Sequence, residues 1–87
     1  MKKKTIEKHT ENAEYNEAEY FKKVGERLKY YRKKAGYTHY EQFASKHGFT
    51  RPQYGKYEAG ANIPFNILLK ISHALGVSLE EFFKGFK

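Results

Sequence analysis

The residue types that most often carry catalysis or bind metals are scarce in this 87-residue sequence. It has no Cys and no Asp, so neither a disulfide framework nor a thiolate metal site is available. None of its four His is four residues from another, the spacing that places two imidazoles on one helix face. No Ser-His-acid set has supporting context, and no Gly-rich phosphate loop follows a strand. We therefore expect no metal, no cofactor and no enzymatic activity.

A denser group of hydrogen-bonding side chains follows Gly48. Tyr54 and Tyr57 are three residues apart, which places both on the inner face of a helix over about 51–58. The residues that would then point outward are Arg51, Gln53, Gly55 and Lys56. Hydrogen-bond donors combined with positive charge suit a polyanion such as nucleic acid. A solvated helix face is the alternative interpretation.

Positive charge is concentrated in the part of the chain that has folded patterning. Residues 1–20 carry four Lys and five Glu (−1), and residues 21–87 carry thirteen Lys or Arg and five Glu (+8), which sum to the formal net charge of +7. Such a basic surface attracts polyanions, although it also serves solubility. No apolar run approaches the roughly 18 residues of a membrane span, and no hydrophobic segment follows the N-terminal lysines. We expect a cytoplasmic, nucleoid-associated protein.

A helix as short as 51–58 must be held by packing, because propensity alone contributes little to its stability. Gly48 ends a preceding helix over about 39–47, and Phe49 follows as an apolar plug. Three Ser or Thr residues are followed three positions later by Glu or Gln, which predicts capping boxes. These pairs are Thr38 with Glu41, Thr50 with Gln53, and Ser78 with Glu81.

Three more helices complete an all-α, five-helix fold. The first covers about 17–34 with Asn16 as its N-cap, the fourth covers about 64–75, and a short fifth follows Ser78. Residues 1–15 are polar and have no core face, so we expect a flexible tail (1–15) before a single domain (16–87).

These features together resemble a known family. The residues that carry the resemblance are Ala44, Gly48, Tyr54, Tyr57, Glu58 and Gly60. They are similar to the helix-turn-helix of the Cro/phage-repressor (XRE-like) family of DNA-binding regulators, with its small residue, turn glycine and closing Glu-x-Gly. The flanking segments VGERLKYYRKKAG (24–36) and LLKISHALGVSLEEFF (68–83) resemble other helices of that family, so the resemblance covers roughly 21–84.

Two departures indicate a variant branch of the family. The interval from Gly36 to Ala44 is one residue longer than usual, and the interval after Glu58 is one shorter. The Gln that usually opens the second helix and grips a phosphate is missing, and Tyr40 or His39 stands nearest. The Tyr40 hydroxyl could meet a phosphate, or its ring could cover the core.

The resemblance implies sequence-specific binding of double-stranded DNA through the major groove by the helix that begins at Thr50. The DNA contacts that it implies are Tyr40, Thr50, Arg51, Pro52, Gln53 and Lys56. Arg51 is the best candidate to read guanine, and Gly55 would let the helix approach the DNA closely. The resemblance also implies an ion pair between Arg32 and Glu58 that holds the first helix against the recognition helix.

The last helix has an unusual density of aromatic residues. Its apolar residues are Leu79, Phe82, Phe83 and Phe86. Three Phe in five residues predict an exposed apolar patch, and family members often dimerise at this end, which implies a homodimeric repressor reading an inverted repeat. The alternative is that all three pack inward.

The sequence is also compatible with two other roles. One is an antitoxin that binds its own operator and holds a toxin through its N-terminal tail. The other is a helix-turn-helix that serves only protein–protein interaction. Within the DNA-binding interpretation, Lys2, Lys3 and Lys4 could also form a basic arm on DNA.

Overall fold

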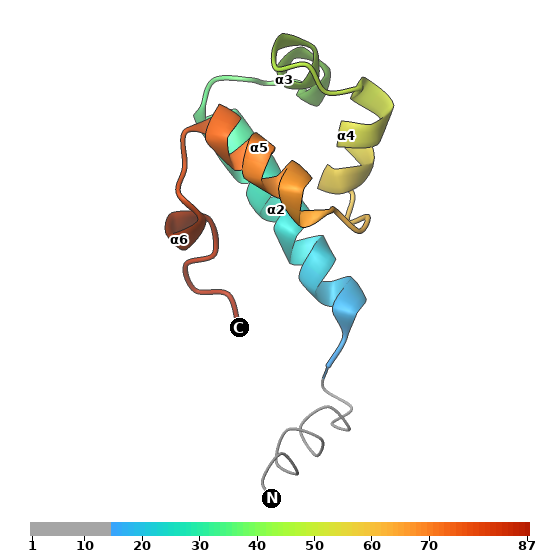
Figure 1. Ribbon diagram of the computed structural model, residues 1–87, viewed down its shortest axis with the longest axis vertical. Coiled ribbons are helices and arrows are strands. Elements are labelled where there is room, and N and C mark those ends of the chain that lie inside the picture. Colours follow the sequence, from blue (N-terminus) through green and yellow to red (C-terminus); the bar gives the residue numbers. More distant parts are fainter. Residues whose placement is uncertain (1–14) are drawn as a thin grey trace, which may run out of the picture.

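The computed structural model describes residues 15–87, and this part of the chain consists of helices joined by short loops (Figure 1). The helices are α2 (Glu17–Lys34), α3 (Tyr40–Lys46), α4 (Arg51–Glu58), α5 (Phe65–Leu75) and α6 (Leu79–Phe82). The predicted all-α class and order of helices are confirmed. The predicted lysine arm and nearly all of the predicted tail lie outside the described residues.

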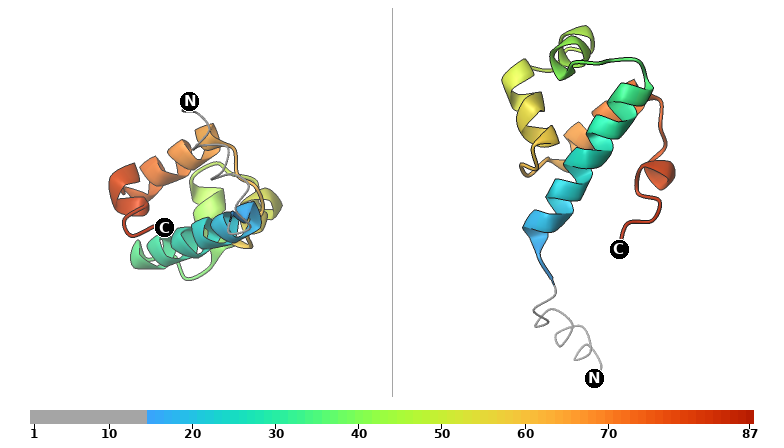
Figure 2. Two further views of the ribbon diagram at one scale, coloured as in Figure 1. Left: turned by 90° about the horizontal axis from the view of Figure 1, so that it is seen from below. Right: turned by 180° about the vertical axis from the view of Figure 1, so that it is seen from behind.

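The longest helix, α2, is the element around which the others are arranged (Figures 1 and 2). It begins at the predicted cap, where the Asn16 side chain accepts a hydrogen bond from the backbone N–H of Glu19. α5 runs in roughly the same direction as α2 but lies apart from it in the view from below, while α3 packs against α4 and both of these pack against α2. None of the helices in residues 15–87 is both long enough and apolar enough to span a membrane.

Every helix contributes one large, fully buried side chain to a single core. These residues are Leu28 from α2, Phe43 from α3, Tyr54 from α4, Ile71 from α5 and Phe82 from α6. Burial of such a side chain contributes about 1.5–3 kcal/mol relative to leaving it exposed. The core therefore ties even the two shortest helices, α3 and α6, to the rest of the domain.

Gly25 allows α2 and α4 to approach each other more closely than any other residue would permit. A Cβ at this position would lie 2.5 Å from the carbonyl oxygen of Glu58 and 2.8 Å from that of Tyr57. Both neighbours are backbone atoms, which cannot move aside as a flexible side chain can. The last turn of α4 therefore rests directly on the backbone of α2.

Two of the three predicted capping boxes are wrong. α3 begins at Tyr40 with His39 as its N-cap, and neither His39 nor Thr50, the N-cap of α4, makes a side-chain cap hydrogen bond. The carbonyl of Thr38 is instead held by Arg32, and the chain enters α3 one residue later than predicted. The third is confirmed for its N-cap, because the Ser78 hydroxyl accepts a hydrogen bond of 3.0 Å from the N–H of Glu81, while the reciprocal bond to the Glu81 side chain is not formed within residues 15–87.

The C-terminal aromatic residues pack against α2 rather than forming one exposed patch. Phe82 is fully buried, so it belongs to the core and not to the exposed apolar patch that was predicted to include it. Phe83 and Phe86 are partly buried against the core, as the inward-packing alternative required. Arg27 of α2 donates hydrogen bonds to the carbonyls of Phe82 and Lys84, and its guanidinium lies 4.8 Å from the centre of the Phe86 ring.

Candidate nucleic-acid interface

The turn between α3 and α4 is built around Phe49. Gly48 adopts a left-handed conformation (φ +81°), and the Phe49 N–H then donates a 2.8 Å hydrogen bond back to the carbonyl of Ala44. The centre of the Phe49 ring lies 6.2 Å from those of Phe43 of α3 and Tyr54 of α4, whose own ring centres are 5.2 Å apart. The three rings therefore form one aromatic cluster that joins the turn to both helices.

The predicted Arg32–Glu58 ion pair is present and almost entirely buried. Arg32 Nε lies 2.8 Å from Glu58 Oε2, and Arg32 Nη2 lies 3.0 Å from Oε1, so the contact is bidentate. Arg32 Nη1 also donates to the carbonyls of Tyr37 and Thr38, at 2.8 Å each. One guanidinium therefore joins the end of α2, the loop before α3 and the end of α4. The hydrogen bonds to Glu58 raise the pKa of Arg32 above its usual range.

The Tyr54 hydroxyl lies beside this ion pair without a hydrogen-bond partner among residues 15–87. Burial raises the pKa of Tyr54 above its usual range, and the neighbouring Glu58 carboxylate acts in the same direction. The phenol is therefore held in its neutral form.

The outer face of α4 differs from this buried junction because its polar side chains are exposed. The residues on this face are Thr50, Arg51, Pro52, Gln53 and Lys56. Within the described part of the chain their side chains make no hydrogen bond or ion pair with the protein. The first turn of α4 contains no acidic residue, so the positive end of the helix dipole is not neutralised there.

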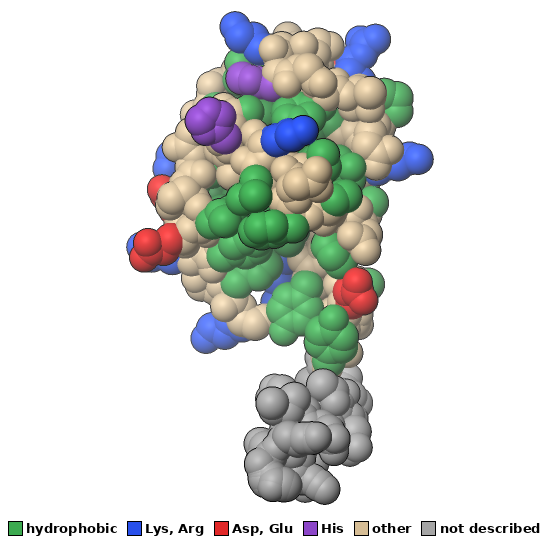
Figure 3. Space-filling view, viewed as in Figure 1, with side chains coloured by type: hydrophobic (Ala, Val, Ile, Leu, Met, Phe, Trp, Pro, Cys, Tyr) green, Lys and Arg blue, Asp and Glu red, His purple; other side chains and the backbone are tan. Residues whose placement is uncertain are grey.

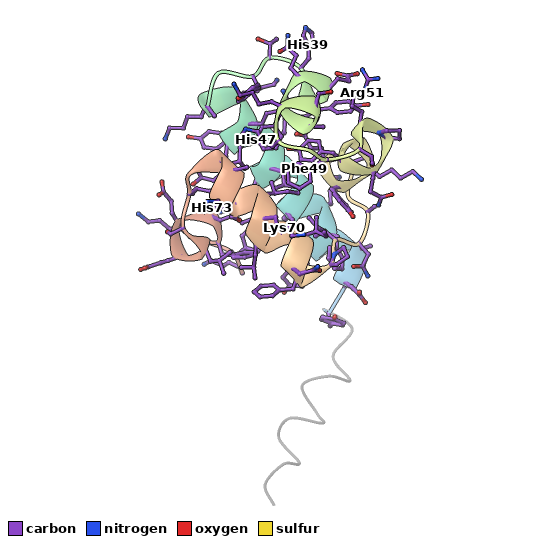
Figure 4. The ribbon with its side chains drawn as sticks, turned by 45° about the horizontal axis from the view of Figure 1, so that its top comes forward. His39, His47, Phe49, Arg51, Lys70 and His73 are labelled. Atoms are coloured by element: carbon purple, nitrogen blue, oxygen red, sulfur yellow. The ribbon has the colours of Figure 1, made fainter. Side chains whose placement is uncertain are left out.

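The starts of α3 and α4 lie near the same end of the molecule (Figure 4). His39, the residue before α3, and Arg51, the first residue of α4, both lie at the upper edge in this view. Two helix N-termini that face one edge favour an anionic ligand there, because both present unpaired N–H groups and positive dipole ends.

Gly55 has a different role from the one that its position on the helix predicted. A Cβ at Gly55 would lie 2.9 Å from Cε1, Cζ and the hydroxyl oxygen of Tyr40. The Tyr40 ring therefore occupies the space that the missing side chain leaves, with its centre 6.2 Å from that of Tyr54. The prediction that Gly55 faces outward is wrong, because this side of α4 is covered by Tyr40.

Tyr40 also borders a polar groove. The groove has a volume of about 450 Å³ and lies between the end of α2, the start of α3 and the Gly55 side of α4. Its charged lining is mixed, with Lys29, Arg32 and Lys33 opposed by Glu41 and Glu58. Both roles that the sequence left open for Tyr40 are compatible with this position, since the side chain is half-buried and lines a groove that also contains lysines. A phosphate contact by this hydroxyl stays a prediction.

The geometry defines a helix-turn-helix, and comparison with known proteins agrees. A helix-turn-helix family model matches residues 28–82. The chain therefore belongs to this family, the Cro/phage-repressor type that the sequence resembled.

One curated relative is the SPbeta prophage-derived uncharacterized HTH-type transcriptional regulator YonR of Bacillus subtilis (strain 168). It is 45% identical over 62 residues, which cover 70% of this chain and 56% of the relative. The chain thus spans little more than half the length of that relative. No solved structure matches the chain.

Sequence reasoning missed two residues that shape this interface, Gly25 and the Gly55 contact with Tyr40. A signal for both existed. Glycine in a helix interior costs about 1 kcal/mol relative to alanine, so its presence there indicates a close approach of another element. The sequence alone does not reveal which element approaches.

Proposed function

We propose that this protein is a sequence-specific double-stranded DNA-binding transcriptional regulator in which α4 reads bases in the major groove. The observation that carries the proposal is the contrast around α4. Its inner face and last turn are fixed by Tyr54, Gly25 and the Arg32–Glu58 pair, while its outer face presents polar side chains without protein partners among residues 15–87. Such a rigid helix with available donors meets the geometric demand of base recognition.

Each exposed residue has a distinct proposed role. Arg51 can present its guanidinium fork to the O6 and N7 atoms of guanine, and Gln53 can pair with adenine. Thr50 makes no cap hydrogen bond, so its hydroxyl is available for a phosphate. Lys56 suits a base or a phosphate, and Pro52 suits the methyl group of thymine. Tyr40 would supply a further phosphate contact from the start of α3.

We also propose that the regulator is a homodimeric repressor that reads an inverted repeat. The partly buried residues Leu79, Phe83 and Phe86 would supply the contact at the C-terminal end. Phe82 would support this surface from within the core. Two copies related by a twofold axis place their recognition helices about one DNA turn apart.

The test is selection of bound sequences from a random duplex pool at near-physiological salt, with the full chain and its Arg51→Ala variant. We expect the wild type to enrich an inverted repeat. Arg51→Ala should lose about 1–3 kcal/mol of discrimination at one base pair of each half-site, because it removes a bidentate contact. Its stability should change by less than about 0.5 kcal/mol, since Arg51 is exposed.

Three results would contradict parts of the proposal. Failure to enrich any sequence, with only weak binding that disappears as salt rises, would favour a protein partner such as a toxin. Equal loss of affinity for all DNA in Arg51→Ala would show that Arg51 holds the backbone rather than reading a base. Enrichment of a single half-site would contradict only the dimeric arrangement and would leave the proposed base recognition by α4 intact.

A further inference from the structure

A second groove lies between the α3–α4 turn and α5, next to the proposed DNA-contacting face. Its volume is about 570 Å³, within the range of roughly 300–1,000 Å³ that is usual for small-molecule sites. Phe49, Tyr57, Ile67 and Ala74 give it an apolar lining. Tyr57 is buried, while Phe49, Ile67 and Ala74 are partly buried against the core, so this lining is preformed by packing.

The polar residues of this groove are basic or neutral. His47, Lys70 and His73 are among the residues that line it, and no lining residue is acidic. Lys70 and His73 lie one turn apart on α5, and both are exposed. Lys70 takes part in no ion pair within residues 15–87. Figure 4 places Phe49, Lys70 and His73 near one another, from the turn and from α5, with His47 at the end of α3 beside them.

We propose that this groove binds a small carboxylic acid with an aromatic or aliphatic body. Its carboxylate would bind the Lys70 ammonium and the His73 imidazole, and its body would pack on Phe49 and Ile67. The absence of acidic residues from the lining selects an anion over a cation. A volume of about 570 Å³ is enough to hold such a molecule. The space-filling view shows histidine and lysine side chains beside apolar surface on this face (Figure 3).

Occupancy of the groove would be coupled to DNA binding through two shared residues. Thr50 and Gln53 line the groove and also belong to the proposed DNA-contacting face. An acid bound beside them places a negative charge near the DNA backbone, so it should weaken DNA binding. By linkage, DNA should weaken binding of the acid by the same factor. This coupling rests on the proposed function, whereas binding of the acid to the free protein does not.

The first experiment is therefore performed without DNA. The full chain is titrated with phenylbutyrate and, in parallel, with the uncharged alcohol phenylbutanol, while amide NMR shifts are followed. We expect saturable binding of the acid, with shifts centred on residues 47–53 and 67–74. Lys70→Met should weaken the acid at least about tenfold, because it removes a charge-assisted hydrogen bond, and should leave the alcohol unchanged. Lys22→Met, which removes an exposed lysine of α2 that lines neither this groove nor the one beside Tyr40, is the matched control and should change neither.

Equal affinity for acid and alcohol, or absence of saturable binding, would overturn the proposal. Ala74→Phe provides a second test that needs no change of charge. The phenyl ring that replaces the methyl group should fill the groove and exclude both compounds. If it binds both as tightly as the wild type does, the proposal is wrong.

The same titration is then repeated with Arg51→Ala and with operator DNA. Arg51 does not line the groove, so Arg51→Ala should bind the acid normally while losing sequence preference. A protein that binds the acid but enriches no DNA sequence contradicts the proposed function and leaves the groove assignment intact. A protein that enriches an operator but binds no acid contradicts only the groove assignment.

Discussion

The two ends of α4 illustrate opposite uses of polar side chains. At its C-terminal end, Glu58 is buried and bound in a bidentate contact by Arg32, which also holds two loop carbonyls. At its N-terminal end, Thr50, Arg51 and Gln53 are exposed and make no side-chain hydrogen bond within the described residues. These polar groups at the C-terminal end are buried and paired, so they are not available to a ligand, whereas the exposed side chains at the N-terminal end are available.

This difference separates residues that position the helix from residues that meet a partner. A buried ion pair often adds little net stability relative to apolar residues, but removal of one member strands a charge in the core. An exposed side chain without partners can be removed at almost no cost to folding. Substitutions at the C-terminal end of α4 should therefore affect stability first, and those at its N-terminal end should affect binding first.

The largest effect is expected when the ion pair is broken from one side. Glu58→Ala leaves Arg32 buried without its carboxylate and should lower the free energy of unfolding by about 3–5 kcal/mol. Urea denaturation followed by circular dichroism measures this change. Glu41→Ala, which removes an exposed carboxylate from α3, is the matched control and should cost less than about 0.5 kcal/mol. A loss below about 1 kcal/mol for Glu58→Ala would show that Arg32 finds water instead.

Gly25→Ala tests the same junction without any change of charge. The new methyl group would lie 2.5 Å from the carbonyl oxygen of Glu58, so α4 must shift away from α2. We expect a net loss of about 2–3 kcal/mol despite the better helix propensity of alanine. Thermal unfolding should show a midpoint roughly 10–20 °C lower for a domain of this size. An unchanged or higher midpoint would mean that the two helices can separate freely.

The contrast between Gly25 and Arg32 also shows what sequence can and cannot predict. Helical periodicity predicted the bounds of α2 and α4 correctly, because burial of one face leaves a regular apolar pattern. The Arg32–Glu58 pair followed from family resemblance. Gly25 produces no periodic pattern in the sequence. Its role becomes clear only when the backbone that packs against it is known.

The capping boxes failed for a related reason. The spacing of Thr38 and Glu41 satisfies the local rule, but Arg32, distant in space until the chain folds, captures the Thr38 carbonyl instead. A tertiary contact thus overrode a local preference. Similarly, the density of phenylalanines at the C-terminal end predicted a surface patch. Only the folded position of Arg27 on α2 shows where these residues pack.

Gly55 lies between the two ends of α4, and the Tyr40 ring of α3 packs on it. Tyr40→Phe keeps the ring over Gly55 but removes the hydroxyl, so it should leave stability unchanged. It should weaken binding to all DNA sequences about tenfold, which corresponds to one hydrogen bond to a charged group. Gly55→Ala would displace the ring, since the methyl group would lie 2.9 Å from three Tyr40 atoms. It should weaken DNA binding to a similar extent.

The double variant decides whether the two residues act together. If Gly55 acts only by positioning the Tyr40 hydroxyl, Gly55→Ala combined with Tyr40→Phe should bind DNA no more weakly than Tyr40→Phe alone. Fluorescence anisotropy on operator and scrambled duplexes provides the measurement. Additive losses would assign Gly55 an independent role, and full affinity in Tyr40→Phe would reduce Tyr40 to a packing residue.

The smallest effect on stability is expected at the one buried polar atom of this junction that is not paired in the described part of the chain. The Tyr54 hydroxyl has no hydrogen-bond partner among residues 15–87, and burial raises the pKa of Tyr54. A folded-state pKa above the unfolded value of about 10 means that the contribution of the neutral phenol is complete below pH 10. That contribution is lost as pH rises further, because the unfolded chain releases its proton first. The wild type should therefore lose up to about 1.4 kcal/mol per pH unit above pH 10 relative to Tyr54→Phe.

Near pH 7 the same substitution tests whether the Tyr54 hydroxyl contributes to the stability of the junction. Tyr54→Phe keeps the buried ring and removes a polar atom that lacks a partner within residues 15–87, so its free energy of unfolding should equal or exceed that of the wild type by up to about 1 kcal/mol. Urea denaturation at both pH values measures the two effects on the same samples. A loss of more than about 1 kcal/mol at pH 7 would mean that the hydroxyl donates to Glu58 in solution. Every buried polar group at the C-terminal end of α4 would then be paired within the protein. The exposed groups at the N-terminal end would remain available to a ligand, which is the contrast that the proposed function requires.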